Sequence, residues 1–226
     1  TDGSTVIVDT TPPVVDVNIA SNNDASSIAV EGNEVTLSIL SNEILNNPPS
    51  ILISGTAPTT ITPETQSNAY VATYFPSISV VGATGAVGKI CLDILNERNY
   101  PIEKINLFAS SRSAGKKIIY NNNELIVKEA TKNSFDESDV VFISADSNVS
   151  LELAPSAVNS GALVIDDGSA FRMKEDVPLV VPEVNENDIK THNGIISIPN
   201  CTTTPLVMAV HNLRKLSKIN RIQAAT

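Results

Sequence analysis

The sequence contains few of the residues on which disulfide-bonded, metal-bound or membrane-spanning proteins depend. It has no tryptophan, two cysteines, two histidines and 4% aromatic residues in 226. Two cysteines at unrelated positions form neither a disulfide framework nor a metal cluster, so we predict no metal site. No run approaches the roughly 18 apolar residues of a membrane span. The basic residues form no stripe, so we expect neither nucleic acid nor a membrane as a partner.

The first third of the chain contains no lysine or arginine. Residues 1–75 carry eight Asp or Glu, and all 15 Lys and Arg follow them, so the net charge of −10 divides into −8 and −2. Twenty of these 75 residues are Ser or Thr. Such a change in composition marks a domain boundary. We therefore predict two domains, residues 1–75 and residues 76–226.

The first third shows short strand patterns separated by turn residues, without a helical period. We expect strands at residues 6–8, 14–19, 35–40, 51–53 and 70–75. With the strings Asp9-Thr-Thr-Pro-Pro-Val, Glu31-Gly-Asn-Glu-Val-Thr-Leu and Ser41-Asn-Glu, this region resembles tandem bacterial Ig-like repeats. The resemblance implies a partial, all-β Ig-like sandwich of secreted or surface origin, without a catalytic constellation.

A glycine-rich turn follows the first apolar run after the boundary. Residues 77–81 predict a strand that leads into Gly82-Ala-Thr-Gly-Ala-Val-Gly88. A helix should follow, with its core face formed by Val87, Ile90, Cys91, Ile94 and Leu95. In this context glycines let backbone amides approach a pyrophosphate at the helix N-terminus. The spacing is not G-x-G-x-x-G, so a tight turn that binds nothing stays open as an alternative.

The loop after the next expected strand, residues 105–109, carries no acid. An NAD-selective site usually places a carboxylate there for the ribose 2′-hydroxyl. This loop offers hydroxyls and Arg112 instead, a set that suits a 2′-phosphate. We therefore predict NADP as the cofactor, with a solvated basic loop as the alternative.

The remaining apolar runs fit the same sheet. Strands are expected at residues 140–144, 163–166 and 195–198, with crossover helices such as residues 151–160. Near-continuous apolar strands are typical of parallel sheets covered on both faces. The sequence therefore predicts a Rossmann-type, doubly wound α/β fold.

One cysteine stands between the last expected strand and a helix. We expect that helix to begin at Thr202 or Thr203, with Pro205 in its first turn, where the missing N–H costs nothing. A thiol at a helix N-terminus loses its proton more readily, so Cys201 is a candidate nucleophile. The alternative is a small residue buried at the end of a strand.

Several motifs occur together along the second part of the chain. They are Ser79-Val-Val-Gly-Ala-Thr-Gly-Ala-Val-Gly88, Ser111-Arg-Ser-Ala-Gly-Lys116, Ala154-Pro155, Ser169-Ala-Phe-Arg-Met173, Val177-Pro-Leu-Val-Val-Pro-Glu-Val-Asn185 and Pro199-Asn-Cys-Thr-Thr203. In this order they resemble aspartate-semialdehyde dehydrogenase, over residues 78–226. The resemblance implies a cytoplasmic, homo-oligomeric oxidoreductase of lysine, threonine and methionine biosynthesis. Its reaction would be the NADPH-dependent reduction of aspartyl phosphate to aspartate semialdehyde, with release of phosphate.

The resemblance also assigns roles to residues. Cys201 would attack the acyl phosphate and form a thioester, Asn200 would lie beside the acyl oxygen, and Arg172 would hold the substrate phosphate. The alternative for Arg172 is an ion pair with Glu175 or Asp176. The cofactor contacts would be Gly82, Thr84, Gly85, Ala86, Val87, Gly88, Ser110, Arg112 and Ser113. Asp146, Asp167 and Gly168 depart from the family pattern.

The family's general acid–base histidine and its carboxylate-binding arginine lie in a later domain. Neither His192 nor His211 matches that histidine, and we expect both to be non-catalytic. We therefore expect a truncated or chimeric chain that joins an Ig-like piece to the cofactor-binding half of the enzyme. The alternative is a secreted or surface structural or adhesion protein with an inert α/β segment.

We predict that the pure chain binds NADP but does not turn over. The acid–base group and the carboxylate ligand that the family uses are missing from the sequence, so the chemical step lacks two of its participants. The measurement is the absorbance of NADPH during incubation with NADP, aspartate semialdehyde and phosphate. Semialdehyde oxidation by the pure chain would contradict the prediction.

Overall fold

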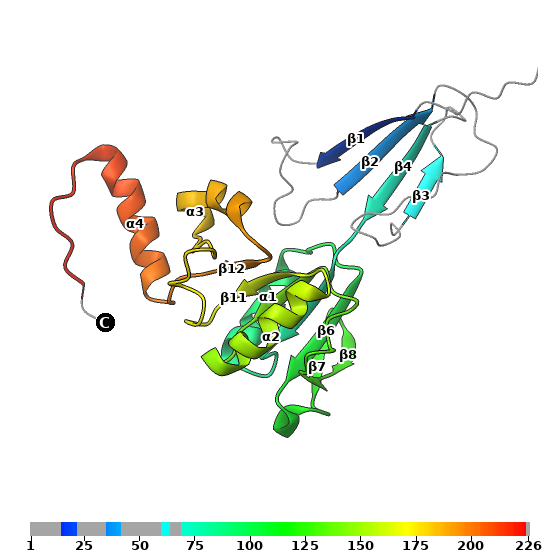
Figure 1. The fold of residues 1–226 in the computed structure, drawn as a ribbon, viewed down its shortest axis with the longest axis horizontal. Coiled ribbons are helices and arrows are strands. Elements are labelled where there is room, and N and C mark those ends of the chain that lie inside the picture. The colour runs from blue at the N-terminus through cyan, green and yellow to red at the C-terminus, as the bar shows by residue number, and fades with distance from the viewer. Residues whose placement is uncertain (1–14, 22–34, 42–59, 64–68, 225–226) are drawn as a thin grey trace, which may run out of the picture. The chain divides into compact units, whose positions relative to one another are not determined.

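The computed structural model describes residues 15–21, 35–41, 60–63 and 69–224. The chain divides into two compact units, Thr1–Phe75 and Pro76–Thr226. Each unit is described by itself below, with the labels of Figure 1.

The described strands of the first unit form one antiparallel sheet in the order β1-β2-β4-β3. They are β1 (Val15–Ser21), β2 (Val35–Ser41), β3 (Thr60–Pro63) and β4 (Ala69–Tyr74). Three expected strands are confirmed to within two residues, β3 was missed, and the strands expected at residues 6–8 and 51–53 lie outside the described residues. A sandwich needs two facing sheets. Since the described strands form a single sheet, the Ig-like repeat stays a prediction.

The second unit is built on a six-stranded parallel sheet in the order β12-β11-β10-β5-β6-β9. Its strands are β5 (Ser77–Val81), β6 (Lys104–Ala109), β9 (Lys128–Glu129), β10 (Val140–Ile143), β11 (Leu163–Asp166) and β12 (Ile195–Ser197). The predicted parallel α/β sheet is confirmed. A separate hairpin, β7 (Lys117–Tyr120) and β8 (Asn123–Ile126), was not expected.

Helices follow most of the sheet strands. They are α1 (Ala86–Glu97), α2 (Ser147–Asn159), α3 (Pro182–Asn185) and α4 (Thr203–Leu216), with 3-10 turns η1 (Ser111–Ser113) and η2 (Glu186–Thr191). Helix α2 begins before residue 151 because the Asp146 carboxylate accepts the amide hydrogens of Asn148 and Val149, at 3.0 and 3.2 Å. None of the helices in the described ranges is both long and apolar enough to cross a bilayer.

Alternate residues of β5 face two cores on opposite sides of the sheet. On one side, Val80 lies in a cluster with Leu92 of α1. On the other, Val81 lies with Leu153 and Ala154 of α2. Helices therefore cover both faces, and the sheet is buried between them.

Helix α1 turns toward the core a face that overlaps only in part with the one predicted. Val87, Ile90 and Ile94 are 44, 56 and 38% exposed, whereas Gly88 and Leu92 are buried. A Cβ on Gly88 would lie 2.3 Å from the carbonyl oxygen of Gly82, so only a glycine lets the helix approach the turn this closely. This contact sets the rotation of α1. The predicted core face was therefore wrong for these three residues, whereas Leu95 of the same face packs against the core and Cys91 is half-buried.

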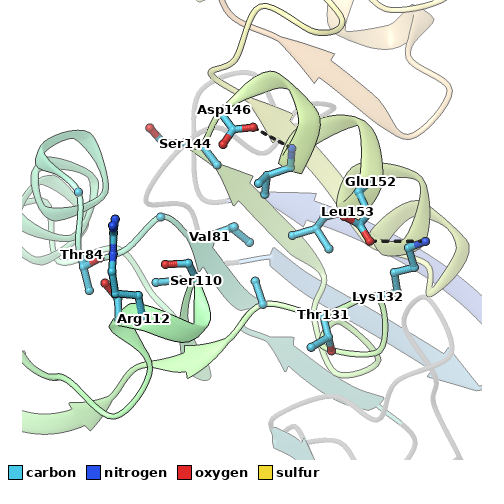
Figure 2. Close-up of a pocket in the computed structure, with 17 residues that line it drawn as sticks. Val81, Thr84, Ser110, Arg112, Thr131, Lys132, Ser144, Asp146, Glu152 and Leu153 are labelled. Carbon is cyan, nitrogen blue, oxygen red and sulfur yellow. Dashed lines mark hydrogen bonds and ion pairs between the residues drawn. The ribbon is translucent and has the colours of Figure 1, made fainter.

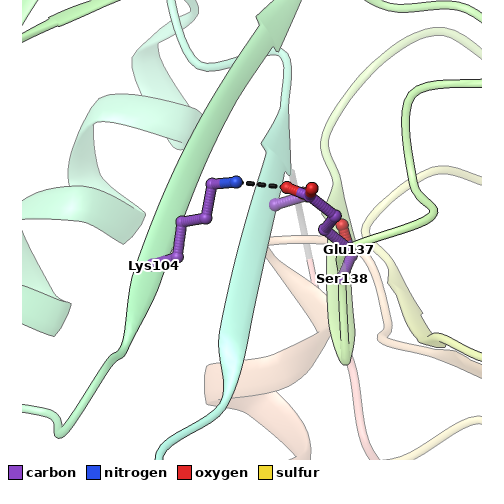
Figure 3. Close-up of polar contacts among 4 residues, drawn as sticks. Lys104, Glu137 and Ser138 are labelled. Atoms are coloured by element: carbon purple, nitrogen blue, oxygen red, sulfur yellow. Dashed lines mark hydrogen bonds and ion pairs between the residues drawn. The ribbon is translucent and has the colours of Figure 1, made fainter. Parts of the chain in front are cut away.

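A polar cluster ties the loop after β9 to the neighbouring strands. Lys104 of β6 forms an ion pair with Glu137, shown in Figure 3, and this bond lowers the pKa of Glu137. The hydroxyls of Ser79 and Ser138 lie 2.6 Å apart and are buried. These contacts hold the loop that leads into β10, and the other end of the same loop reaches the pocket described next.

We predict that Gly82→Ala destabilises the second unit far more than Gly115→Ala. Both glycines have left-handed φ angles, +86° and +84°. A Cβ at Gly82 would lie 2.1 Å from the carbonyl oxygen of Ser144, whereas a Cβ at Gly115 meets no atom within 4 Å. Gly115→Ala should lower the free energy of unfolding by about 1–2 kcal/mol, from backbone strain alone. Gly82→Ala should lower it by at least about 3 kcal/mol, because the steric clash adds to the strain.

The measurement is urea unfolding followed by the helical circular dichroism signal. Every helix of the described residues lies in the second unit, so the unfolding of these helices reports on that unit. Equal decreases in the free energy of unfolding for the two variants would contradict the steric role of Gly82.

Candidate functional site

A pocket of about 500 Å³ opens at the carboxyl ends of β5, β6 and β10 (Figure 2). Ligands of α/β proteins bind at this edge of the sheet, and the volume lies within the range of small-molecule sites. The lining residues are Val81, Gly82, Thr84, Gly85, Ala109, Ser110, Arg112, Ser113, Ala130, Thr131, Lys132, Ser144, Ala145, Asp146, Val149, Glu152 and Leu153.

The glycine turn forms one wall of the pocket. The amides of Gly82 and Ala83 donate to the carbonyl of Phe108 at 2.9 and 3.1 Å, which fixes the turn against β6. Gly85 is the N-cap of α1 and provides no side-chain cap. The first-turn amides of α1 therefore stay available to an anionic ligand, which also meets the positive end of the helix dipole.

The loop after β6 forms a second wall, and it is basic. The carbonyl of Ser110 accepts from the amide of Ser113 at 2.8 Å, which closes the η1 turn. In Figure 2 the Arg112 side chain extends beside Thr84. The Lys116 amine donates to the Ser113 hydroxyl at 3.2 Å, so two cations and the hydroxyls of this loop gather in one place.

Three segments of the pocket wall were not predicted as cofactor contacts. Two follow β9 and β10 and contribute residues 130–132 and 144–146, and the third lies on α2 and contributes Val149, Glu152 and Leu153. Lys132 and Glu152 form an ion pair of 3.6 Å at one end of the pocket. The loops after β9 and β10 could have been found from the sequence by their place directly after strands of a parallel sheet, because such loops line the binding site. Asp146, a departure from the family pattern, uses its carboxylate to cap α2.

The structure brings together some predicted cofactor residues and leaves others outside the pocket. The residues that line it are Gly82, Thr84, Gly85, Ser110, Arg112 and Ser113. Ala86, Val87 and Gly88 do not line it, although they form the first turn of α1. Asn200, Cys201 and Arg172 also lie outside its wall.

Cys201 stands exposed where the chain enters α4. The helix begins at Thr203, which confirms the predicted start. The Asn200 side-chain oxygen lies 3.7 Å from the Cys201 sulfur and accepts from the Thr202 amide at 3.0 Å. Because β10, β11 and β12 are adjacent and parallel, the strand before Cys201 ends about 10 Å along the sheet from β10.

Arg172 is held by two backbone carbonyls. Its Nε donates to Ile198 at 2.9 Å and its Nη2 to Asp167 at 2.7 Å. Within the described part of the chain, no ion pair joins it to Glu175 or Asp176.

The two histidines do not lie in the pocket wall. His192 accepts the amide hydrogen of Gly194 at 2.9 Å, and desolvation lowers the pKa of His211 in α4. No group of three His, Cys, Asp or Glu side chains in the described residues is arranged to hold a metal ion.

A buried carboxyl lies at the end of β11, between the pocket and Arg172. Asp166 is fully buried, and its Oδ1 accepts from the Ser150 hydroxyl at 2.7 Å. Burial raises the pKa of Asp166, and the Ser150 hydrogen bond opposes that rise. A Cβ on Gly168 would come within 3.2 Å of both carboxyl oxygens, so this departure from the family pattern relieves crowding. The third departure, Asp167, accepts from the Ser144 hydroxyl at 3.1 Å.

Comparisons with known proteins agree with this geometry. Residues 77–192 match the protein-family model described as the NAD binding domain of semialdehyde dehydrogenase. The aspartate-semialdehyde dehydrogenase of Bacillus subtilis (strain 168) is 48% identical over 149 residues, 66% of this chain and 43% of the relative. That of Aquifex aeolicus (strain VF5) is 43% identical over 152 residues, 66% of this chain and 45% of the relative. The chain thus spans less than half the length of these curated relatives.

Solved structures show the same likeness. The crystal structure of aspartate semialdehyde dehydrogenase II complexed with ASA from Vibrio cholerae has a TM-score of 0.60 at 36% identity. The match covers 62% of this chain and 47% of the Vibrio cholerae chain. The enzyme with NADP from Candida albicans has a TM-score of 0.52 at 30% identity, over 63% of this chain and 47% of that one. The parallel sheet is therefore that of a Rossmann-like NAD(P)-binding domain.

We predict that Asp166→Asn flattens the pH dependence of stability between acid and neutral pH. A folded-state pKa above the unfolded value makes the folded protein bind more protons, so stability falls as pH rises through that interval. Because asparagine cannot ionise, the variant does not lose this stability as the pH rises. Urea unfolding from about pH 4 to pH 7 measures it, starting near the unfolded pKa of Asp.

Ser150→Ala serves as the opposing variant. It removes the hydrogen bond that favours the charged carboxylate, so it should steepen the same pH dependence. Parallel pH profiles for wild type, Asp166→Asn and Ser150→Ala would contradict the assignment of the slope to Asp166.

Proposed function

The chain belongs to the semialdehyde dehydrogenase family through its NAD-binding domain, and from this we propose that it is the NADP-binding half of an aspartate-semialdehyde dehydrogenase. The observation that carries the proposal is the pocket, which joins a glycine turn, an uncapped helix start and a basic loop at one edge of a parallel sheet. Cys201 emerges from a strand end at the same edge.

The lining residues fit a dinucleotide phosphate. Gly85 and the first turn of α1 would hold the pyrophosphate, since bare amides and the helix dipole both favour anions. Arg112, with the hydroxyls of Ser110 and Ser113, would hold the 2′-phosphate and select NADP over NAD. The NADP in the Candida albicans structure supports this choice. Ala86, Val87 and Gly88 would contribute backbone rather than side chains.

Cys201 would be the nucleophile of the reaction. Its sulfur would bond to the acyl carbon of aspartyl phosphate while the carbon–oxygen bond to phosphate breaks, and phosphate would leave with the electron pair. NADPH, when bound, supplies the hydride that reduces the resulting thioester to the semialdehyde and frees the thiolate. Asn200 would orient the acyl oxygen, because it lies next to the sulfur and is fixed by its bonds to Thr202. Arg172 would face the leaving phosphate.

The substrate and the metabolic role of the chain are part of the same proposal. The Vibrio cholerae structure is described with ASA, which supports aspartate semialdehyde as the substrate of this family. We propose that this chain acts in lysine, threonine and methionine biosynthesis in the cytoplasm, as part of a homo-oligomer.

We predict that the chain binds NADPH at least about tenfold more tightly than NADH, and that Arg112→Ala removes the preference. The reason is that a guanidinium–phosphate contact is a charge-assisted hydrogen bond, available only to the phosphorylated ribose. The measurement is calorimetric titration of the pure chain with each cofactor.

The matched control is Lys190→Ala, which removes one exposed cation that does not line the pocket. It should leave the preference unchanged. Equal affinity of the wild type for both cofactors, or an Arg112→Ala chain that still prefers NADPH, would contradict the proposed role of Arg112.

A further inference from the structure

The two segments that Arg172 joins belong to neighbouring strands. Asp167 directly follows β11, and Ile198 directly follows β12. The guanidinium donates to one carbonyl from each segment, at 2.7 and 2.9 Å. Phe171, which is buried in the core, anchors the chain beside it. The arginine therefore bridges two strand ends at the edge of the sheet where the site lies.

One of these carbonyls is close to the nucleophile along the chain. Only two residues separate Ile198 from Cys201, the buried Pro199 and the exposed Asn200. The amide of Ile198 is bonded in turn to the carbonyl of Asp166 at 3.1 Å. The carbonyl of Asn200 accepts from the amides of Thr203 and Thr204 at 2.8 and 3.1 Å, which joins this short segment to α4. The position of the thiol therefore depends on how Ile198 is held.

The other carbonyl leads toward the pocket. The Asp167 side chain accepts from the hydroxyl of Ser144, a residue of the pocket wall, at 3.1 Å. A continuous set of hydrogen bonds thus runs from Ser144 through Asp167 and Arg172 to Ile198. It links the cofactor pocket to the loop that carries Cys201.

From these contacts we infer that Arg172 is a positioning residue that fixes the Cys201 loop relative to the cofactor pocket. This role rests on the proposed function of Cys201 and is additional to any contact with phosphate. The two bonds use two of the five N–H donors of the guanidinium, so donors stay available for an anion. A lysine ammonium is a point charge without the planar fork, and it does not reproduce two in-plane bonds to separate carbonyls.

The test is hydrogen exchange of the pure chain, followed by mass spectrometry of peptides that cover residues 196–204, in phosphate-free buffer. We expect Arg172→Lys and Arg172→Ala to speed exchange of these amides at least about tenfold, because the loop opens locally when its bridge is lost. Peptides from β5 and β10, and the affinity for NADPH, should not change. Guanidinium ion at millimolar concentration should restore protection in Arg172→Ala, and a lysine in place of the arginine should not.

The matched control is Lys174→Ala, which removes an exposed cation nearby without touching either carbonyl. It should exchange like the wild type. Wild-type protection in Arg172→Lys would overturn the inference, because charge alone would then suffice. Faster exchange throughout the sheet in Arg172→Lys would also overturn it, since the arginine would then serve global folding. The exchange measurement needs neither cofactor nor turnover, so it is independent of whether the proposed function holds.

Discussion

The close approach of bare backbone at the turn between β5 and α1 is the constraint on which the rest of the second unit depends. Gly82 lies against the backbone of Ser144, and Gly88 lies against Gly82, at separations that leave no room for a Cβ. The first contact brings β5 and the end of β10 together, and the second sets the rotation of α1. Gly85, the N-cap of α1, lies in the pocket wall. Packing alone thus requires glycine at both positions.

The site is assembled from loops far apart in the chain, and the parallel sheet brings them to one edge. The glycine turn, the basic loop at Arg112 and the wall at Ser144 each follow a strand end. Cys201 follows a strand at that edge as well, yet it lies outside the pocket wall. The hydrogen bonds through Arg172 supply a physical link between these two regions. The parallel sheet therefore brings these loops to one edge, and hydrogen bonds from a few polar side chains fix their positions relative to one another.

Apolar runs and turn residues predicted most of the sheet of the second unit, because continuous apolar strands leave a clear pattern. The same pattern located the core face of α1 only in part. Leu95 packs against the core, but Val87, Ile90 and Ile94 share its helical spacing and are exposed, because a buried glycine decides the rotation. Strand β9 and the hairpin β7–β8 were missed because they are short or polar. The pairing of Arg172 with two backbone carbonyls was not predictable either, since backbone acceptors leave no mark in the sequence.

An NMR titration of the nitrogen-labelled chain with NADPH would show whether a dinucleotide binds where the glycine turn meets the basic loop. We expect amide shifts to concentrate in residues 82–88, 110–113 and 144–146, with smaller changes along the loop at Cys201. Shifts centred on the separate cavity beside Lys128 and Glu137, or none at saturating NADPH, would contradict it.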